Sequence, residues 1–211
     1  RFTRVFFDNG RINGFGEGTG QTLMFAGAHC ISRRIFDLLP DREFSGITED
    51  VYLPAVRQKS ATLSGVRYDG PWFDIGTPSR YLSASESIST LMLGGELKPP
   101  TGSRADQQRK SILSDSCRIE GDVERSVVGT RSIVHAGATV RRSVLWEEVS
   151  IGADCEVTDA IIGNGVDFQS GSRVQNAMVC RRRDVQYADG IILNDKFAFV
   201  PIDNSRPSIV E

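Results

Sequence analysis

Histidine and cysteine are scarce in this sequence of 211 residues, which limits the metal and redox chemistry it can carry. It has only two histidines, His29 and His135, and this excludes a histidine-rich metal site. Its four cysteines contain no Cys-x-x-Cys pair of the kind that indicates a zinc site or a redox motif. Because isolated cysteines are typical of reduced, structural residues, we expect a cytoplasmic protein.

Long apolar runs and an excess of basic charge are also missing. No stretch approaches the roughly 20 apolar residues of a membrane-spanning helix, and we find no signal-peptide pattern. The formal net charge of −2 argues against a nucleic-acid surface. The composition, 39% hydrophobic and 25% charged, is ordinary for a globular protein. We therefore expect neither a membrane nor a nucleic acid among its partners.

A repeat of constant period runs through the C-terminal half of the chain. Four segments start at a step of 17 in the numbering, namely 126–128, 143–145, 160–162 and 177–179. Two further columns keep this step, the first with Cys117, Val134, Ile151 and Phe168, the second with Val123, Val140, Val157 and Val174. Apolar positions within one coil are spaced by six, six and five, a rhythm that a helix of about 3.6 residues per turn does not produce.

This rhythm predicts a β-solenoid from about residue 110 to 181, with three short strands per coil and a turn at each corner. The side chains expected to point inward within one coil are Val128, Val134, Val140 and Leu145. Small residues recur where the interior is expected to be narrow, at Gly121, Ala138, Cys155 and Ser172. An antiparallel sandwich is the alternative fold for this region.

Residues 1–93 mix strand and helix signals and predict an α/β region. Strands are expected at 2–7, 11–15, 22–29 and 63–68, the first two joined by an Asn-Gly turn. Helices are expected after three candidate caps, Ser32, Thr48 and Thr77. Residues 94–111, polar and containing Gly and Pro, predict a linker. Because the sequence opens directly in a strand, we expect a fragment whose N-terminal portion is absent.

Three segments of this first region resemble motifs of the sugar nucleotidyltransferases, the NDP-sugar pyrophosphorylases that include mannose-1-phosphate guanylyltransferases and glucose-1-phosphate nucleotidyltransferases. Residues 72–84 (WFDIGTPSRYLSA) resemble their W-x-D-x-G-T motif, residues 25–32 (FAGAHCIS) their GxHxxS segment, and residues 47–52 (ITEDVY) an acidic helix start. Many members also carry a C-terminal left-handed parallel β-helix.

The resemblance implies a division into four parts. Residues 1–93 would form the C-terminal, sugar-phosphate side of a Rossmann-like catalytic domain, and 94–111 the linker. Residues 112–181 would form the left-handed β-helix, and 182–211 a C-terminal tail. An exposed solenoid face favours a homo-oligomer.

The resemblance also implies a reaction in which a sugar 1-phosphate attacks the α-phosphate of a nucleoside triphosphate and pyrophosphate leaves, with Mg²⁺ between the two polyanions. The resemblance implies that Asp74 is a metal ligand, that Gly27 lies close to the sugar and that Glu49 binds the sugar hydroxyls. It assigns no residue a direct catalytic role. The family's glycine-rich, arginine-containing nucleotide loop is not found in these residues, so we expect the chain alone to be inactive.

Plainer interpretations stay open beside these roles. Asp74 could be a surface aspartate, Gly27 a glycine needed for backbone packing, and Glu49 a first-turn residue that complements the helix dipole.

Two other functions of the protein also stay open. One is a hexapeptide acyltransferase, for which His135 is the candidate base. The other is a non-catalytic regulatory or scaffold subunit built on the nucleotidyltransferase fold.

Overall fold

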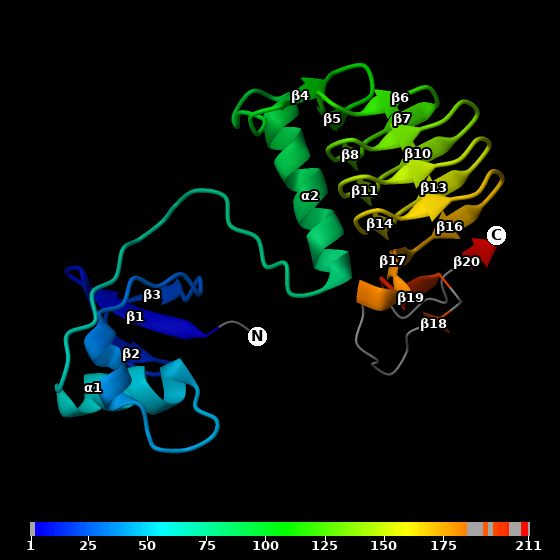
Figure 1. Cartoon of the computed structure of the whole chain (residues 1–211). Coiled ribbons are helices and arrows are strands. Elements are labelled where there is room, and N and C mark those ends of the chain that lie inside the picture. Colours follow the sequence, from blue (N-terminus) through cyan, green and yellow to red (C-terminus); the bar gives the residue numbers. More distant parts are fainter. Residues whose placement is uncertain (1–2, 185–191, 194–195, 203–207, 211) are drawn as a thin grey trace. The chain divides into compact units, whose positions relative to one another are not determined.

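The computed structural model describes residues 3–184, 192–193, 196–202 and 208–210. The chain divides into two compact units, Arg1–Trp72 and Phe73–Glu211. The first is a small mixed α/β unit, and the second contains a β-solenoid of four coils, both drawn in Figure 1. None of the described helices is long and apolar enough to cross a membrane.

The first unit is built on a three-stranded antiparallel sheet in the order β2-β1-β3. Its strands are β1 (Arg4–Asp8), β2 (Arg11–Phe15) and β3 (Gln21–Met24). The predicted hairpin is confirmed, and Asn9 and Gly10 turn it with φ angles of 47° and 79°, as a two-residue type I′ turn requires.

Three short helices follow the sheet. A 3-10 helix, η1 (Arg33–Leu38), begins at the predicted cap, where the Ser32 hydroxyl accepts a hydrogen bond from the Arg34 amide. A π-helix, η2 (Ile47–Tyr52), leads directly into α1 (Leu53–Gln58). The small core between sheet and helices contains Val5, Phe15, Val51 and Tyr52.

Three expectations for this unit were wrong in detail. The strand expected at 22–29 ends at Met24, and within 63–68 only Ser64 forms a bridge, to Arg11. Thr48 does not cap its helix. Instead, the Gly46 amide donates a 2.7 Å hydrogen bond to the carboxylate of Asp50, which moves the helix start two positions earlier.

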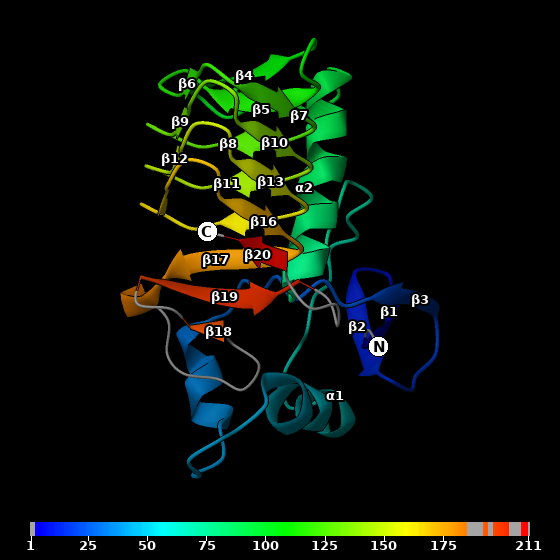
Figure 2. The same cartoon turned by 90° about the vertical axis from the view of Figure 1, so that its right-hand side faces the viewer.

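The solenoid consists of three parallel sheets that each take one strand from every coil (Figure 2). The first sheet holds β5 (Ser111–Ser114), β8 (Val127–Val128), β11 (Val144–Leu145), β14 (Ile161–Ile162) and β17 (Ala177–Arg181). The second holds β6 (Arg118–Ile119), β9 (Ile133–Val134), β12 (Ser150–Ile151) and β15 (Asp167–Phe168). The third holds β7 (Asp122–Glu124), β10 (Thr139–Arg141), β13 (Glu156–Thr158) and β16 (Arg173–Gln175).

The inward columns predicted from the repeat are confirmed. Val128, Val134, Val140 and Leu145 are each no more than 2% exposed and lie in one continuous core. Each pairs with the residue one period further on, as Leu145 does with Ile162. The small residues Ala138, Cys155 and Ser172 are also buried.

The first coil departs from the prediction because it is shorter. Ile119, not Cys117, pairs with Val134, so the step along this column is reduced here, and Cys117 is half-buried beside the core. The first coil is shorter at the corner between β6 and β7, where its turn contains fewer residues than the turns of the later coils. Gly121 fits there because a Cβ at this position would collide with the carbonyl oxygen of Ala138.

The corners of the coils are turned by residues in the left-handed region, and these also recur with the period of the repeat. Two corners mix glycine with other residues, as in the series Arg131, Glu148, Gly165 and the series Gly137, Asp154, Gly171. The corner between the third and first sheets uses no glycine: it holds Lys110, Arg125, Arg142, Asp159 and Asn176, with φ between 45° and 54°. We refer to these five residues as the polar corner.

A ladder of serines joins successive coils beside the polar corner. The Ser126 amide donates to the hydroxyl of Ser111 at 3.0 Å, and the Ser143 amide donates to the hydroxyl of Ser126 at 3.1 Å. The Ala160 amide donates in turn to Ser143 at 3.1 Å. All three serines are buried, so these hydroxyls satisfy backbone groups that the short strands leave without partners.

Helix α2 (Pro78–Leu93) begins where predicted, with the Thr77 hydroxyl accepting a hydrogen bond from the Arg80 amide. It runs along the outer face of the first sheet, where Tyr81 and Trp146 make an edge contact with ring centroids 6.5 Å apart. An outward column of apolar residues lies on this face: Ile112, Val127, Val144, Ile161 and Met178.

Both ends of the solenoid are covered. In the segment predicted as a linker, β4 (Ser103–Asp106) pairs antiparallel with β5. At the other end β19 (Phe197–Pro201) pairs antiparallel with β17, and Phe197 and Phe199 join the core below the last coil. Two more short strands, β18 (Ile192–Leu193) and β20 (Ser208–Val210), pair with β19 and β16.

Candidate functional site

Gly27 lies in the loop that follows β3. Its φ of 79° is in the left-handed region, which favours glycine, and the position where a Cβ would stand is open space. The residue is therefore required by its backbone conformation, while a ligand can approach the backbone at this point.

The loop is held by side chains on both sides of Gly27. The indole Nε1 of Trp72 donates a 3.2 Å hydrogen bond to the carbonyl oxygen of Ala26. On the other side, His29 Nδ1 lies 2.7 Å from the hydroxyl of Tyr52 in η2. Burial raises the pKa of Tyr52, so the phenol stays protonated and can donate to the imidazole. His29 is thus a hydrogen-bonded histidine that ties the loop to η2.

Glu49 is exposed in the first turn of η2, and within the described residues its carboxylate has no hydrogen bond or ion pair. Its neighbour Asp50 makes the local contacts, an ion pair with Arg42 and the cap at Gly46. The Arg42 hydrogen bond first, and the Gly46 amide second, lower the pKa of Asp50. Glu49 is therefore the acidic side chain of η2 that is available to a ligand.

Asp74 belongs to the second unit, just ahead of α2. One carboxylate oxygen accepts a 3.0 Å hydrogen bond from the Gly76 amide, and the other is ion-paired with Arg80. The described part of the chain contains no cluster of three or more His, Cys, Asp or Glu side chains able to hold a metal. Asp74 can therefore offer a hard cation one oxygen ligand, and the cation would compete with Arg80.

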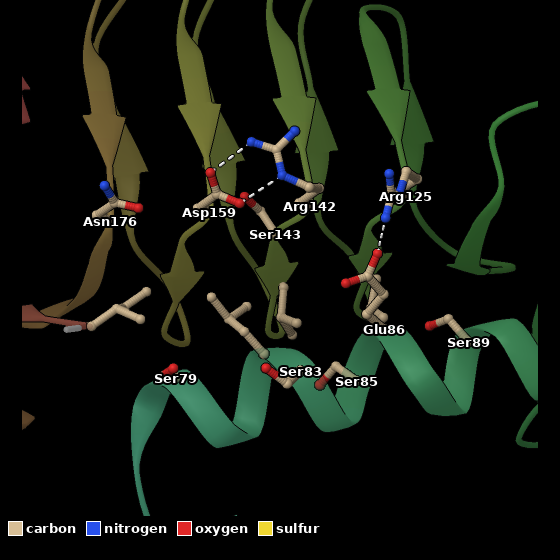
Figure 3. Close-up of a pocket in the computed structure, with 14 residues that line it drawn as sticks. Ser79, Ser83, Ser85, Glu86, Ser89, Arg125, Arg142, Ser143, Asp159 and Asn176 are labelled. Carbon is tan, nitrogen blue, oxygen red and sulfur yellow. Dashed lines mark hydrogen bonds and ion pairs between the residues drawn. The ribbon is translucent and has the colours of Figure 1, made fainter.

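A groove of about 220 Å³ lies between α2 and the polar corner, and sequence reasoning missed it. Figure 3 shows the serines of α2 facing Arg125, Arg142, Asp159 and Asn176. Val127 and Val144 also line the groove. One signal in the sequence indicates that an element covers the outer face of this sheet, although it does not reveal the groove itself. Each strand of the first sheet carries two adjacent apolar residues, as in Val144-Leu145, and such pairs indicate a sheet covered on both faces.

The charges in the groove are balanced. Arg142 makes two hydrogen bonds to Asp159, of 2.7 and 2.6 Å, and Arg125 is ion-paired with Glu86 of α2. The first pair joins successive coils, and the second joins the helix to the solenoid. Each arginine of the groove therefore has a carboxylate partner.

Comparison with known proteins gives two results for the C-terminal part. Residues 99–192 match the family described as GlmU-like, C-terminal hexapeptide. The glucose-1-phosphate adenylyltransferase of Fervidobacterium nodosum is 29% identical over 121 residues, which cover 51% of this chain and 29% of the relative. The enzyme of the same name from Paramagnetospirillum magneticum is 31% identical over 112 residues, 51% of this chain and 26% of the relative.

The expected similarity to sugar nucleotidyltransferases is thus confirmed for the C-terminal part. The chain carries a GlmU-like hexapeptide domain and is distantly homologous to glucose-1-phosphate adenylyltransferases. It spans about a quarter to a third of the length of these relatives.

Proposed function

We propose that the chain forms the sugar-phosphate side and the C-terminal, left-handed β-helix of a sugar-1-phosphate nucleotidyltransferase. The reaction joins a sugar 1-phosphate to a nucleoside triphosphate and releases pyrophosphate, with Mg²⁺ as cofactor. The observation that carries the proposal is the hydrogen bond between Trp72 and Ala26, which ties the first residue of the W-x-D-x-G-T segment to the glycine loop, in a chain whose C-terminal part matches nucleotidyltransferases.

Each predicted site residue has a role in this proposal. The open backbone at Gly27 receives the sugar, and the exposed carboxylate of Glu49 accepts hydrogen bonds from its hydroxyls. Asp74 supplies one oxygen to Mg²⁺ when the metal and the substrate phosphates displace Arg80 from it. A Rossmann-like nucleotide-binding half completes the site from outside these residues. The free thiols of all four cysteines accord with a cytoplasmic location.

A non-catalytic regulatory or scaffold subunit is the second candidate, and the ion pair between Asp74 and Arg80 favours it. An aspartate whose charge is already neutralised by an arginine can serve purely to fix the start of α2. The acyltransferase alternative has less support, since His135 Nδ1 lies 3.8 Å from its nearest carboxylate, Glu120, too far for a hydrogen bond that would orient a base.

Pyrophosphate release tests the proposal. The full-length gene product that contains these residues is assayed with nucleoside triphosphates, sugar 1-phosphates and Mg²⁺, beside the 211-residue chain alone. We expect turnover by the gene product and none by the chain alone. A gene product that binds sugar phosphate without turnover would support the regulatory subunit, and acetyl-CoA-dependent acyl transfer would support the acyltransferase.

A further inference from the structure

We propose that the groove between α2 and the polar corner binds a neutral, polyhydroxylated ligand, a short linear saccharide. This goes beyond the proposed reaction, because the groove uses none of the residues assigned to that reaction. Its lining combines serine hydroxyls, an asparagine amide and paired charges with a few apolar side chains.

The polar corner has residues other than glycine at positions whose positive φ favours glycine. A residue other than glycine at positive φ costs about 1 kcal/mol or more, and the other two corners use glycine in some of their coils. The polar corner uses none, and Arg125, Arg142, Asp159 and Asn176 all line the groove. Their ion pairs account for the presence of the two arginines and Asp159 at this corner. Asn176 carries no charge, so an ion pair does not account for its side chain.

Several hydrogen-bonding groups in the groove lack protein partners. Ser89 is only 7% exposed, yet within the described residues its hydroxyl makes no hydrogen bond. The hydroxyl oxygen keeps some accessible surface, and the residue lines the groove. Over the same residues, the side chains of Ser79, Ser83 and Asn176 also make none. Serine hydroxyls and the asparagine amide both donate and accept, which is what the hydroxyls of a sugar require.

The balanced charges favour a neutral ligand over an anion. An anion would have to draw Arg125 or Arg142 away from its carboxylate and would then lie beside Glu86 or Asp159, with repulsion between like charges. A hydroxyl avoids this conflict, because it can donate to the carboxylate and accept from the guanidinium of the same pair.

The dimensions favour a linear ligand. Ser79 and Ser89 lie about 15 Å apart along α2, at about 1.5 Å per residue. From Arg125 to Asn176 the corner advances three coils, about 14 Å at the spacing of neighbouring strands. The polar rows on the two sides of the groove therefore run in parallel for a similar length. Val127, Val144 and Ile202 also line the groove and offer apolar contacts to the face of a sugar ring.

Amide chemical shifts of the 211-residue chain test this, titrated separately with maltotriose and with inorganic phosphate. We expect maltotriose to give saturable shifts at Ser83, Ser89 and Asn176. Ser83→Trp, which fills the groove from an exposed helix position, should abolish them. Ser87→Trp is the matched control, because Ser87 is exposed on the same helix and does not line the groove.

Asn176→Ala should weaken maltotriose binding by about five- to tenfold, the effect of about one lost hydrogen bond. The proposal is overturned if maltotriose causes no saturable shift at these amides, if Ser83→Trp and Ser87→Trp behave alike, or if phosphate shifts the same amides at lower concentration than maltotriose. The last result would identify an anion site.

Discussion

Trp72 and Ala26, 46 positions apart in the sequence, are joined by a 3.2 Å hydrogen bond from the indole Nε1 to the carbonyl oxygen. The bond connects the start of the W-x-D-x-G-T segment to the loop that holds Gly27. Trp72, the first residue of one segment that resembles a nucleotidyltransferase motif, thus contacts a residue of another such segment, although a sequence pattern alone cannot establish this.

Trp72→Phe should loosen the glycine loop while keeping most of the aromatic surface. We expect faster amide hydrogen exchange at residues 26–29 and a loss of about 1 kcal/mol in the stability of the first unit, the usual contribution of one hydrogen bond. Tyr68→Phe is the control, since its hydroxyl makes a weak, exposed hydrogen bond of 3.3 Å. Equal exchange rates in both variants would show that the Trp72 bond does not hold the loop.

Val140→Asp should destabilise the solenoid by several kcal/mol, because it places an unpaired charge at a fully buried position of the core. Arg141→Gln, at the next residue of the same strand, points outward and should change the melting temperature little. Thermal unfolding of the two variants measures the difference. If Val140→Asp melted with the parent, the inward assignment would be wrong.

Much of the solenoid could be predicted from the sequence because its period repeats the same local environment four times, as at Val123, Val140, Val157 and Val174. The place where prediction failed, Cys117, is where the period breaks at the short first coil. The packing of α2 on the first sheet could not be predicted from the helix sequence, because serines are interspersed among its apolar residues.

The candidate site was less predictable. The sequence indicated Gly27, Glu49 and Asp74, but their partners depend on tertiary contacts such as the ion pair of Asp74 with Arg80. Likewise, neither the Tyr52 hydroxyl beside His29 nor the groove along the polar corner follows from local sequence, since each is assembled from segments far apart in the chain.

Ser126→Ala should cost about 1–3 kcal/mol, because the buried amide of Ser143 would lose its hydrogen-bond acceptor. Chemical denaturation measures the loss. Ser87→Ala, on the exposed side of α2, is the control and should lie within about 0.5 kcal/mol of the parent. Similar midpoints for the two variants would mean that the serine ladder does not support the coils.

The thiols should react in a fixed order. Burial raises the pKa of Cys117, Cys155 and Cys180, so less thiolate is present at neutral pH, while Cys30 is exposed. Alkylation followed by mass spectrometry should label Cys30 first and the other three much more slowly until the protein unfolds. As the pH rises toward the raised pKa values, labelling of those three should accelerate. Early labelling of Cys155 would contradict the burial of its column.

The effect of Asp74→Asn on pyrophosphate release by the full-length gene product tests the proposed function most directly. The substitution keeps the shape of the side chain and its hydrogen bond from Gly76, but removes the charge that Mg²⁺ needs. Asp69→Asn is the matched control, because Asp69 is an exposed aspartate paired with Arg67. We predict a folded Asp74→Asn variant that loses most of its turnover and needs more Mg²⁺ for the remainder, with Asp69→Asn close to the parent. Parental turnover of Asp74→Asn at an unchanged Mg²⁺ requirement would contradict the metal role and leave Asp74 as the residue that fixes the start of α2.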